Sequence, residues 1–189
     1  MRPPLVFARV FAIVVALGVV APSLARAQMP RNGLAVDARL GAGLIVGGTS
    51  AVVAQPSLTV GGRLIDRIQL GLGVGFYRIS SPGGGPNGTN QTTFTFAPTI
   101  EVDLLKARDN KAAWYAKGAL PMGAEITQPR NFFVLGYDVA LGARYCPHPN
   151  FAAALEGGVT GIFVDPRGNG GFGVTTVYGA LVGTFYWGK

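Results

Sequence analysis

Apolar and polar residues alternate with a period of two along nearly the whole chain after residue 33. The segment 173–187 shows this most clearly, with Val177, Leu181 and Phe185 on one face and Thr176 and Thr184 on the other. Such alternation predicts β-strands and not helices. The segment is long for a strand of a soluble sheet, but it suits a strand tilted across a bilayer, which needs about 9 to 11 residues.

Eight segments of this kind follow one another, separated by turns rich in Gly, Pro, Asn and Asp. They are 34–46, 57–65, 68–77, 93–104, 113–125, 133–145, 151–164 and 173–187. An even number of strands joined only by hairpins is typical of outer-membrane barrels, and a closed sheet leaves no unpaired edge. The pattern therefore predicts an all-β fold, an eight-stranded antiparallel up-and-down transmembrane β-barrel.

The charged residues of the strands share the face opposite the apolar one. These residues are Asp37, Arg39, Arg63, Glu101, Asp103, Lys117, Glu125, Asp138, Arg144 and Glu156. A Lys or Arg facing the middle of a bilayer costs about 2 to 4 kcal/mol, so a lipid-facing surface excludes such residues. We therefore expect the apolar face to point outward and the charges to point into the barrel.

Aromatic residues on the apolar face gather near both ends of the strands. With an N-terminus in the periplasm, one belt near the outer ends contains Phe76, Phe94, Phe133 and Phe163, and the other, near the periplasmic ends, contains Trp114, Tyr145, Phe151, Phe185 and Trp187. Two such belts are expected at the two interfaces of a membrane. The rival fold, a soluble lipocalin-like barrel with its apolar face inside, gives no reason for them.

Two prolines fall within predicted strands. Pro98 and Pro121 have no amide hydrogen to donate to the sheet, so they predict β-bulges or a local change of strand phase.

The N-terminus has the pattern of a cleaved signal peptide. Residues 1–27 contain the basic Arg2 and Arg9, an apolar core over 10–21 and an Ala25-Arg26-Ala27 cleavage site, so we expect a mature barrel domain over 28–189. Cleavage lowers the net charge from +7 to +4, a mild excess that does not call for nucleic acid as a partner. No apolar run after residue 30 is long enough for a membrane helix.

The last strand resembles the C-terminal strand of bacterial outer-membrane barrels, which ends on an aromatic residue as Phe185-Tyr186-Trp187 does here, although Gly188 and Lys189 follow. Nearly the whole mature chain is similar to the small eight-stranded barrels of the OmpA and OmpX type, without a peptidoglycan-binding domain. The resemblance implies an outer-membrane location in a Gram-negative-type bacterium. Its implied partners are outer-membrane lipid and lipopolysaccharide, and the barrel assembly machinery during biogenesis. We expect a monomer.

The barrel interior allows two interpretations. Eight strands enclose a space just wide enough for side chains, so the inward charges are expected to pair with one another. We expect a structural network of Arg39, Arg63, Glu101, Asp103, Lys117, Asp138, Arg144 and Glu156. In the alternative, these residues gate or line a narrow pore, and the inward glycines Gly71, Gly73 and Gly75 leave room for water.

Candidate chemistry outside the network is sparse. His148 is the only histidine, lies between two prolines in a predicted turn over 146–150, and has no nucleophile on an inward strand position to activate. Cys146 has no disulfide partner and no metal-ligand cluster around it, so we expect an inert or partly exposed thiol. We expect no catalytic, cofactor or metal site. The predicted function is a non-enzymatic structural or surface-interaction role through the loops 80–91 and 165–171, with a narrow passive channel as the alternative and a lipid-modifying enzyme third.

Overall fold

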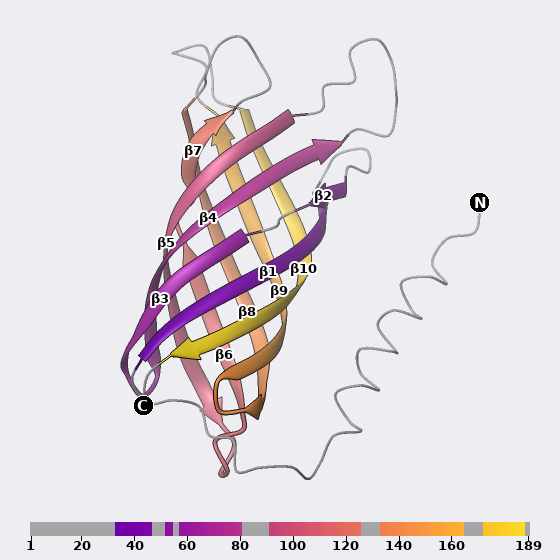
Figure 1. Ribbon diagram of the computed structural model, residues 1–189. Coiled ribbons are helices and arrows are strands. Elements are labelled where there is room, and N and C mark those ends of the chain that lie inside the picture. The colour runs from indigo at the N-terminus through magenta and orange to yellow at the C-terminus, as the bar shows by residue number, and fades with distance from the viewer. Residues whose placement is uncertain are drawn as a thin grey trace, which may run out of the picture.

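Strands are the only regular elements in the described part of the chain. The computed structural model describes residues 33–46, 52–54, 57–80, 91–125, 133–164 and 172–187, so the expected signal peptide lies outside the described residues. The strands are β1 (Gly33–Ile45), β2 (Val52–Ala54), β3 (Ser57–Ile65), β4 (Ile68–Ser80), β5 (Gln91–Lys106), β6 (Ala112–Ala119), β7 (Met122–Glu125), β8 (Phe133–His148), β9 (Phe151–Val164) and β10 (Phe172–Trp187) (Figure 1). Within the described ranges, no helix is long and apolar enough to cross a membrane.

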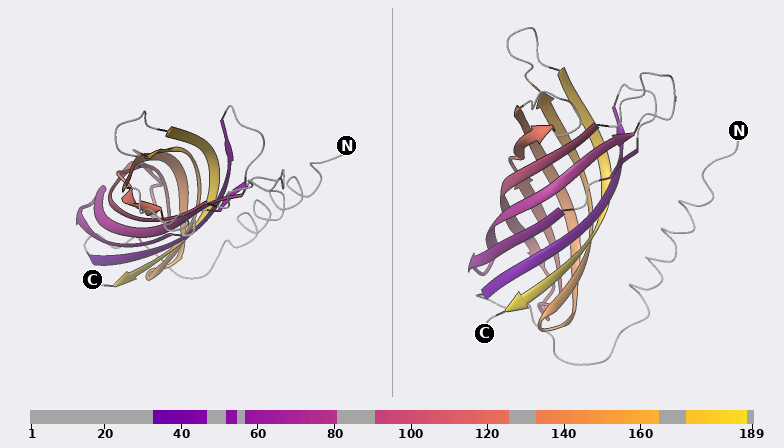
Figure 2. Two further views of the ribbon diagram at one scale, coloured as in Figure 1. Left: turned by 90° about the horizontal axis from the view of Figure 1, so that it is seen from above. Right: turned by 45° about the horizontal axis from the view of Figure 1, so that its top comes forward.

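These strands form one closed antiparallel sheet with eight positions around it. β1 pairs with β10 from Leu34 opposite Trp187 to Ile45 opposite Thr176, which closes the barrel. β2 and β3 share one position between β1 and β4, and β6 and β7 share one position between β5 and β8. Seen from above, the strands curve around a common axis (Figure 2). The predicted eight-stranded up-and-down barrel is confirmed.

The barrel has two distinct ends. At the turn end, the chain reverses at Asp66–Arg67, between Lys106 and Ala112, and at Pro149–Asn150, and the last strand also ends there (Figure 1). At the loop end, β4 finishes and β5 begins. Apart from the strand residues Ser80 and Gln91, the predicted loops 80–91 and 165–171 lie outside the described residues.

Side chains alternate between a polar interior and an apolar exterior, as the sequence pattern requires. In β8, Asp138 and Arg144 are buried, whereas Leu135, Val139 and Leu141 are exposed to the outside. The same alternation runs through the other long strands, because successive side chains of a strand point to opposite faces. An apolar outer wall with a polar interior is the reverse of a soluble barrel and suits a surface solvated by lipid.

The two prolines interrupt hydrogen bonding but do not shift the register. Opposite β5, the pairs Thr99–Ala119 and Phe96–Met122 continue the same register on both sides of the break at residues 120–121. Pro98 accepts a backbone hydrogen bond from Leu120, and the carbonyl of Pro121 accepts one from Gly136. The expectation of a bulge or phase change at these prolines is therefore wrong, because each proline keeps its carbonyl as an acceptor and lacks only the donor.

Register shifts occur instead at the turn end. They lie between Asp103 and Leu105 in β5, between Tyr145 and His148 in β8, and near the end of β3. The shift in β8 lets that strand extend to His148, so the predicted turn over 146–150 is reduced to Pro149–Asn150. This extension carries Cys146 into the interior, where only 1% of its surface is exposed. Of the two expectations, an inert or a partly exposed thiol, the partly exposed one is therefore wrong.

Candidate functional site

The barrel interior is filled by charged side chains from six strands. All eight residues of the expected network are there, each no more than 7% exposed: Arg39, Arg63, Glu101, Asp103, Lys117, Asp138, Arg144 and Glu156. Asp37 joins them at 5% exposure. The side chain of Glu125, the tenth charge expected to point inward, lies outside the described residues. The alternation of the strands thus brings together charges that are far apart in the sequence.

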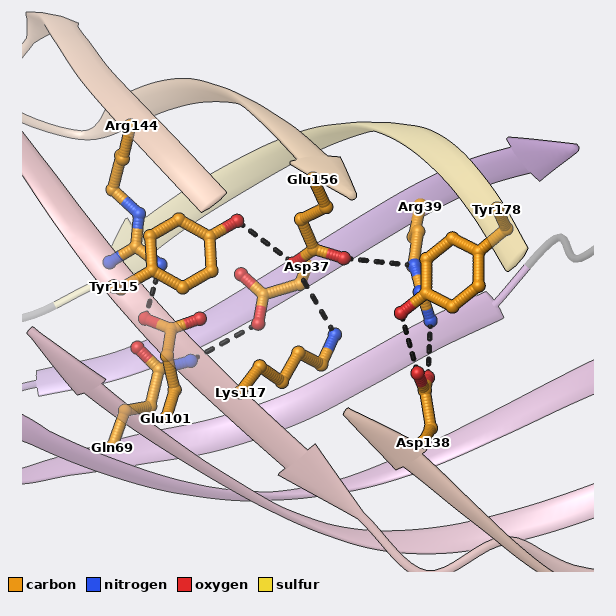
Figure 3. Close-up of polar contacts among 10 residues, drawn as sticks. All are labelled: Asp37, Arg39, Gln69, Glu101, Tyr115, Lys117, Asp138, Arg144, Glu156 and Tyr178. Carbon is orange, nitrogen blue, oxygen red and sulfur yellow. Dashed lines mark hydrogen bonds and ion pairs between the residues drawn. The ribbon is translucent and has the colours of Figure 1, made fainter. Parts of the chain in front are cut away.

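Arg39 is the centre of one part of this network. Its Nη1 lies 2.8 Å from Oδ2 of Asp138, and its Nε lies 3.0 Å from Oε2 of Glu156 (Figure 3). The guanidinium stacks over the ring of Tyr178, 4.4 Å from the ring centroid, and the hydroxyl of Tyr178 donates to the other oxygen of Asp138. A planar guanidinium is suited to holding two carboxylates and a ring at once.

Arg144 has an equivalent arrangement nearer the turn end. It pairs directly with Glu101 and stacks over the ring of Tyr115 at 4.5 Å (Figure 3). It also lies 3.8 Å from Asp103. The hydroxyl of Tyr115 donates to Glu156 at 2.8 Å, which joins the two arrangements. Each arginine is therefore held by two carboxylates and by an aromatic ring on its face.

Further polar side chains complete the network. Arg63 lies 3.0 Å from Asp103, and Lys106 lies 3.4 Å from the same carboxylate oxygen. Sequence reasoning did not include Lys106, because in a regular strand residues 103 and 106 point to opposite faces, whereas the register shift after Asp103 brings them together. Asp37 accepts a hydrogen bond from the amide of Gln69 at 3.1 Å.

Lys117 is held more loosely than the arginines. Its Nζ lies 3.8 Å from Oε1 of Glu156, a carboxylate that Arg39 and Tyr115 also contact. A contact at this distance is electrostatic and is longer than a hydrogen bond. Removal of Lys117 therefore leaves Glu156 with two other partners, Arg39 and Tyr115.

The two tyrosines of the network are positioned by glycines on neighbouring strands. A Cβ atom on Gly142 would lie 2.3 Å from Cζ of Tyr115, and one on Gly158 would lie 2.6 Å from the hydroxyl oxygen of Tyr178. The rings thus occupy the space that side chains at 142 and 158 would fill. Sequence alternation already placed both tyrosines on the inner face. Only the cross-strand register shows which glycine each one covers.

The interior changes character towards the two ends. At the turn end, five buried residues form an apolar cluster: Ala35, Ala113, Cys146, Ala152 and Tyr186. Towards the loop end, a small cavity of about 30 Å³ is bordered by Arg39, Lys117 and Asp138 and by small residues of β3, β4 and β5. Of the inward glycines expected to leave room for water, Gly73 and Gly75 border this cavity, whereas Thr59 and Thr99 pack against the position of Gly71.

The expected aromatic belts lie on the outer wall. Eight of the nine residues are at least 36% exposed, namely Phe76, Phe94, Phe133, Phe163, Trp114, Tyr145, Phe185 and Trp187, and Phe151 is half-buried. Phe76 and Phe94 contact each other at a centroid distance of 5.3 Å, and Phe151 and Phe185 do so at the same distance. The first pair joins β4 and β5 at the loop end, and the second pair joins β9 and β10 at the turn end.

The two candidate chemical residues outside the network lie at the turn end of β8. His148 is exposed at the end of β8, where its Nδ1 accepts a hydrogen bond from the backbone N–H of Asn150 at 3.2 Å. Cys146 is packed in the apolar cluster of the turn end. Among the described residues, no three His, Cys, Asp or Glu side chains are grouped so as to hold a metal ion.

Comparison with solved structures identifies the same architecture. The crystal structure of Neisserial surface protein A (NspA) superposes with a TM-score of 0.56 at 16% sequence identity, over 82% of this chain and 97% of that chain. The N-terminal β-barrel domain of Pseudomonas aeruginosa OprF gives a TM-score of 0.46 at 10% identity, over 83% and 100% of the two chains. No protein-family model matches the chain, and no curated protein sequence matches it. The superposition with NspA thus shows that the two chains share the fold of a small eight-stranded outer-membrane barrel.

Proposed function

We propose that this protein is a non-enzymatic barrel of the outer membrane of a Gram-negative-type bacterium, with a structural or surface-interaction role. The observation that carries the proposal is the filled interior. Arg39 and Arg144 are each held by carboxylates and a tyrosine, and nine charged side chains across the lumen are almost completely buried. A lumen filled in this way stabilises the barrel and resists the passage of ions.

The fold also suggests how the protein is oriented and what it meets. With the N-terminus on the periplasmic side, the loop end faces the exterior, and the segments 80–91 and 165–171 make the surface contacts. We propose lipid and lipopolysaccharide as the partners of the outer wall, and the barrel assembly machinery as the partner of β10 during biogenesis. The protein is proposed to be a monomer without a nucleic-acid partner. Its export is proposed to use a signal peptide that is cleaved after residue 27.

Single-channel conductance of the mature chain in a planar bilayer tests this role. Folding is established first, from the shift in gel mobility between boiled and unboiled samples. We expect folded barrels that stay silent over long recordings. Steady openings of uniform size would overturn the structural role.

One observation favours a narrow channel as the second candidate. The cavity near the loop end reaches Arg39, Lys117 and Asp138, and Glu156 is shared between two cations that can compete for it. If openings are seen, Lys117→Gln and Glu156→Gln should change the ion preference in opposite directions. Unchanged selectivity in both variants would exclude these residues as the lining of the pore.

A further inference from the structure

A recess of about 420 Å³ lies on the outer wall of the barrel, where β4, β5, β6 and β8 run side by side. Its outer-face lining residues are Leu70, Pro98, Ile100, Gly118, Leu120, Tyr137 and Val139, of which Tyr137 carries the one polar group, a hydroxyl. Thr99, Ala119 and Asp138 also border the recess, although their side chains point into the barrel. The carboxylate of Asp138 is held inside by Arg39 and Tyr178, so no free charge of the lining points into the recess.

Two features of the sequence create the recess. Leu70, Ile100, Gly118 and Val139 are paired across four strands in one row, and the missing side chain of Gly118 leaves a gap in that row. In the adjacent row, Pro98 lies opposite Leu120 at the break between β6 and β7. Because proline has no amide hydrogen, Pro98 cannot return the hydrogen bond that it accepts from Leu120, and the sheet is interrupted beside the gap.

The recess lies between the two aromatic belts and not at either interface. On β5, Ile100 lies six residues from Phe94 of the loop-end belt, and on β6, Gly118 lies four residues from Trp114 of the turn-end belt. A barrel strand rises about 3.3 Å per residue, so both positions are well inside the apolar band. In a membrane, this depth contains only hydrocarbon chains.

We propose that the recess binds one acyl chain of a membrane lipid, in the groove over Gly118 and beside the Pro98–Leu120 break. The proposal rests on the membrane location of the barrel and is independent of whether the lumen conducts. Lipid chains are as apolar as leucine, so preference for this site comes from van der Waals packing of the chain against the walls of the groove. A lipid whose acyl chain occupies the groove therefore exchanges more slowly with the surrounding membrane than lipid on the rest of the outer wall.

Gly118 provides a variant that closes the site without disturbing the interior. A Cβ atom there meets only Cγ2 of Ile100, at an ordinary contact distance of 3.5 Å, so Gly118→Leu fills the groove from the lipid side. Gly157 on β9 is the matched control, because it also faces outward, is exposed, and has no atom within 4 Å of the position that a Cβ atom would occupy. Gly157→Leu adds the same bulk to the outer wall away from the recess.

Photochemical labelling in vesicles tests the proposal. The mature barrel is folded into phosphatidylethanolamine vesicles that contain a small fraction of phospholipid with a mid-chain diazirine, irradiated, and mapped by mass spectrometry of its peptides. We expect labelling at Ile100, Leu120 and Val139 to exceed that of other outward residues at the same depth by about fivefold, to fall to the background in Gly118→Leu, and to persist in Gly157→Leu.

Three results would overturn the acyl-chain site. The first is labelling that is uniform around the wall. The second is recess labelling that Gly118→Leu leaves unchanged although its gel-mobility shift shows a folded barrel. The third is a dimer in sedimentation experiments that Gly118→Leu dissociates, since the groove would then hold a second copy of the chain. Conductance recordings on the same samples test the proposed function separately, because a silent barrel can lack the site and a conducting barrel can have it.

Discussion

Replacement of Arg39 by methionine removes the cation that holds two buried carboxylates. Asp138 loses its contact at 2.8 Å and Glu156 loses one at 3.0 Å, while the length and much of the apolar surface of the side chain are kept. Each carboxylate keeps one tyrosine hydroxyl, from Tyr178 and Tyr115 respectively, and Glu156 also keeps Lys117 at 3.8 Å, so the uncompensated charge is mainly that of Asp138. The variant therefore isolates the loss of the guanidinium charge in an interior where all three partners are at most 5% exposed.

The expected cost is large compared with that of the neighbouring cation. Removing one partner of a buried ion pair costs about 3 to 5 kcal/mol, because the remaining charge stays buried without compensation. Lys117→Met should cost no more than about 1 kcal/mol, because its contact with Glu156 at 3.8 Å is weaker than a hydrogen bond, which is itself worth about that much. Glu156 also keeps Arg39 and Tyr115 in this variant. With an m-value of about 2 kcal/mol/M, the urea midpoint of Arg39→Met should fall by about 2 M.

Equilibrium unfolding in urea measures this difference. The mature barrel and both variants are folded into lipid vesicles, and unfolding is followed by tryptophan fluorescence and by the gel-mobility shift. The double variant Arg39→Met/Asp138→Asn should recover about 1 to 3 kcal/mol relative to the sum of the single changes, because the two residues contact each other. If Arg39→Met costs no more than Lys117→Met, the reasoning is refuted, and the network does not stabilise the interior as described.

Three further predictions concern packing, the outer wall and the turn end. Gly142→Ala should destabilise the barrel by about 1 to 3 kcal/mol through overpacking against Tyr115, since its Cβ would lie 2.3 Å from the ring; an equal loss in a Tyr115→Leu background would contradict this cause. Leu141→Lys should cost about 2 to 4 kcal/mol in vesicles, because Leu141 is 60% exposed on the outer wall; a neutral effect would place this wall outside the hydrocarbon. Cys146 should react with a charged maleimide only after unfolding, since it is 1% exposed in the apolar cluster; rapid labelling of the folded barrel would show an open turn end.

The sequence by itself determined the eight strand positions of the barrel and the face on which the charged residues within the strands lie. A period of two is a local property of an extended chain, so Arg39, Asp138 and Glu156 were assigned to one face without knowledge of their partners. Lipid then decides which face is outside, because it excludes charge. The aromatic belts follow from the same alternation and from the same outward orientation of the apolar face. Residues 80–91 and 165–171 have no such pattern, and their composition indicates only that they are loops.

Only the tertiary structure decided which charges pair and where the wall is interrupted. Arg39 and Asp138 are 99 residues apart, and Arg144 and Glu101 are 43 apart, so their contacts depend on strand register and barrel closure. Lys106 enters the network through a register shift that no periodic pattern contains. The break at Pro121 keeps its register because strands on both sides fix it. Periodicity is set within one strand, whereas register is set between strands, by the combined packing of the closed sheet.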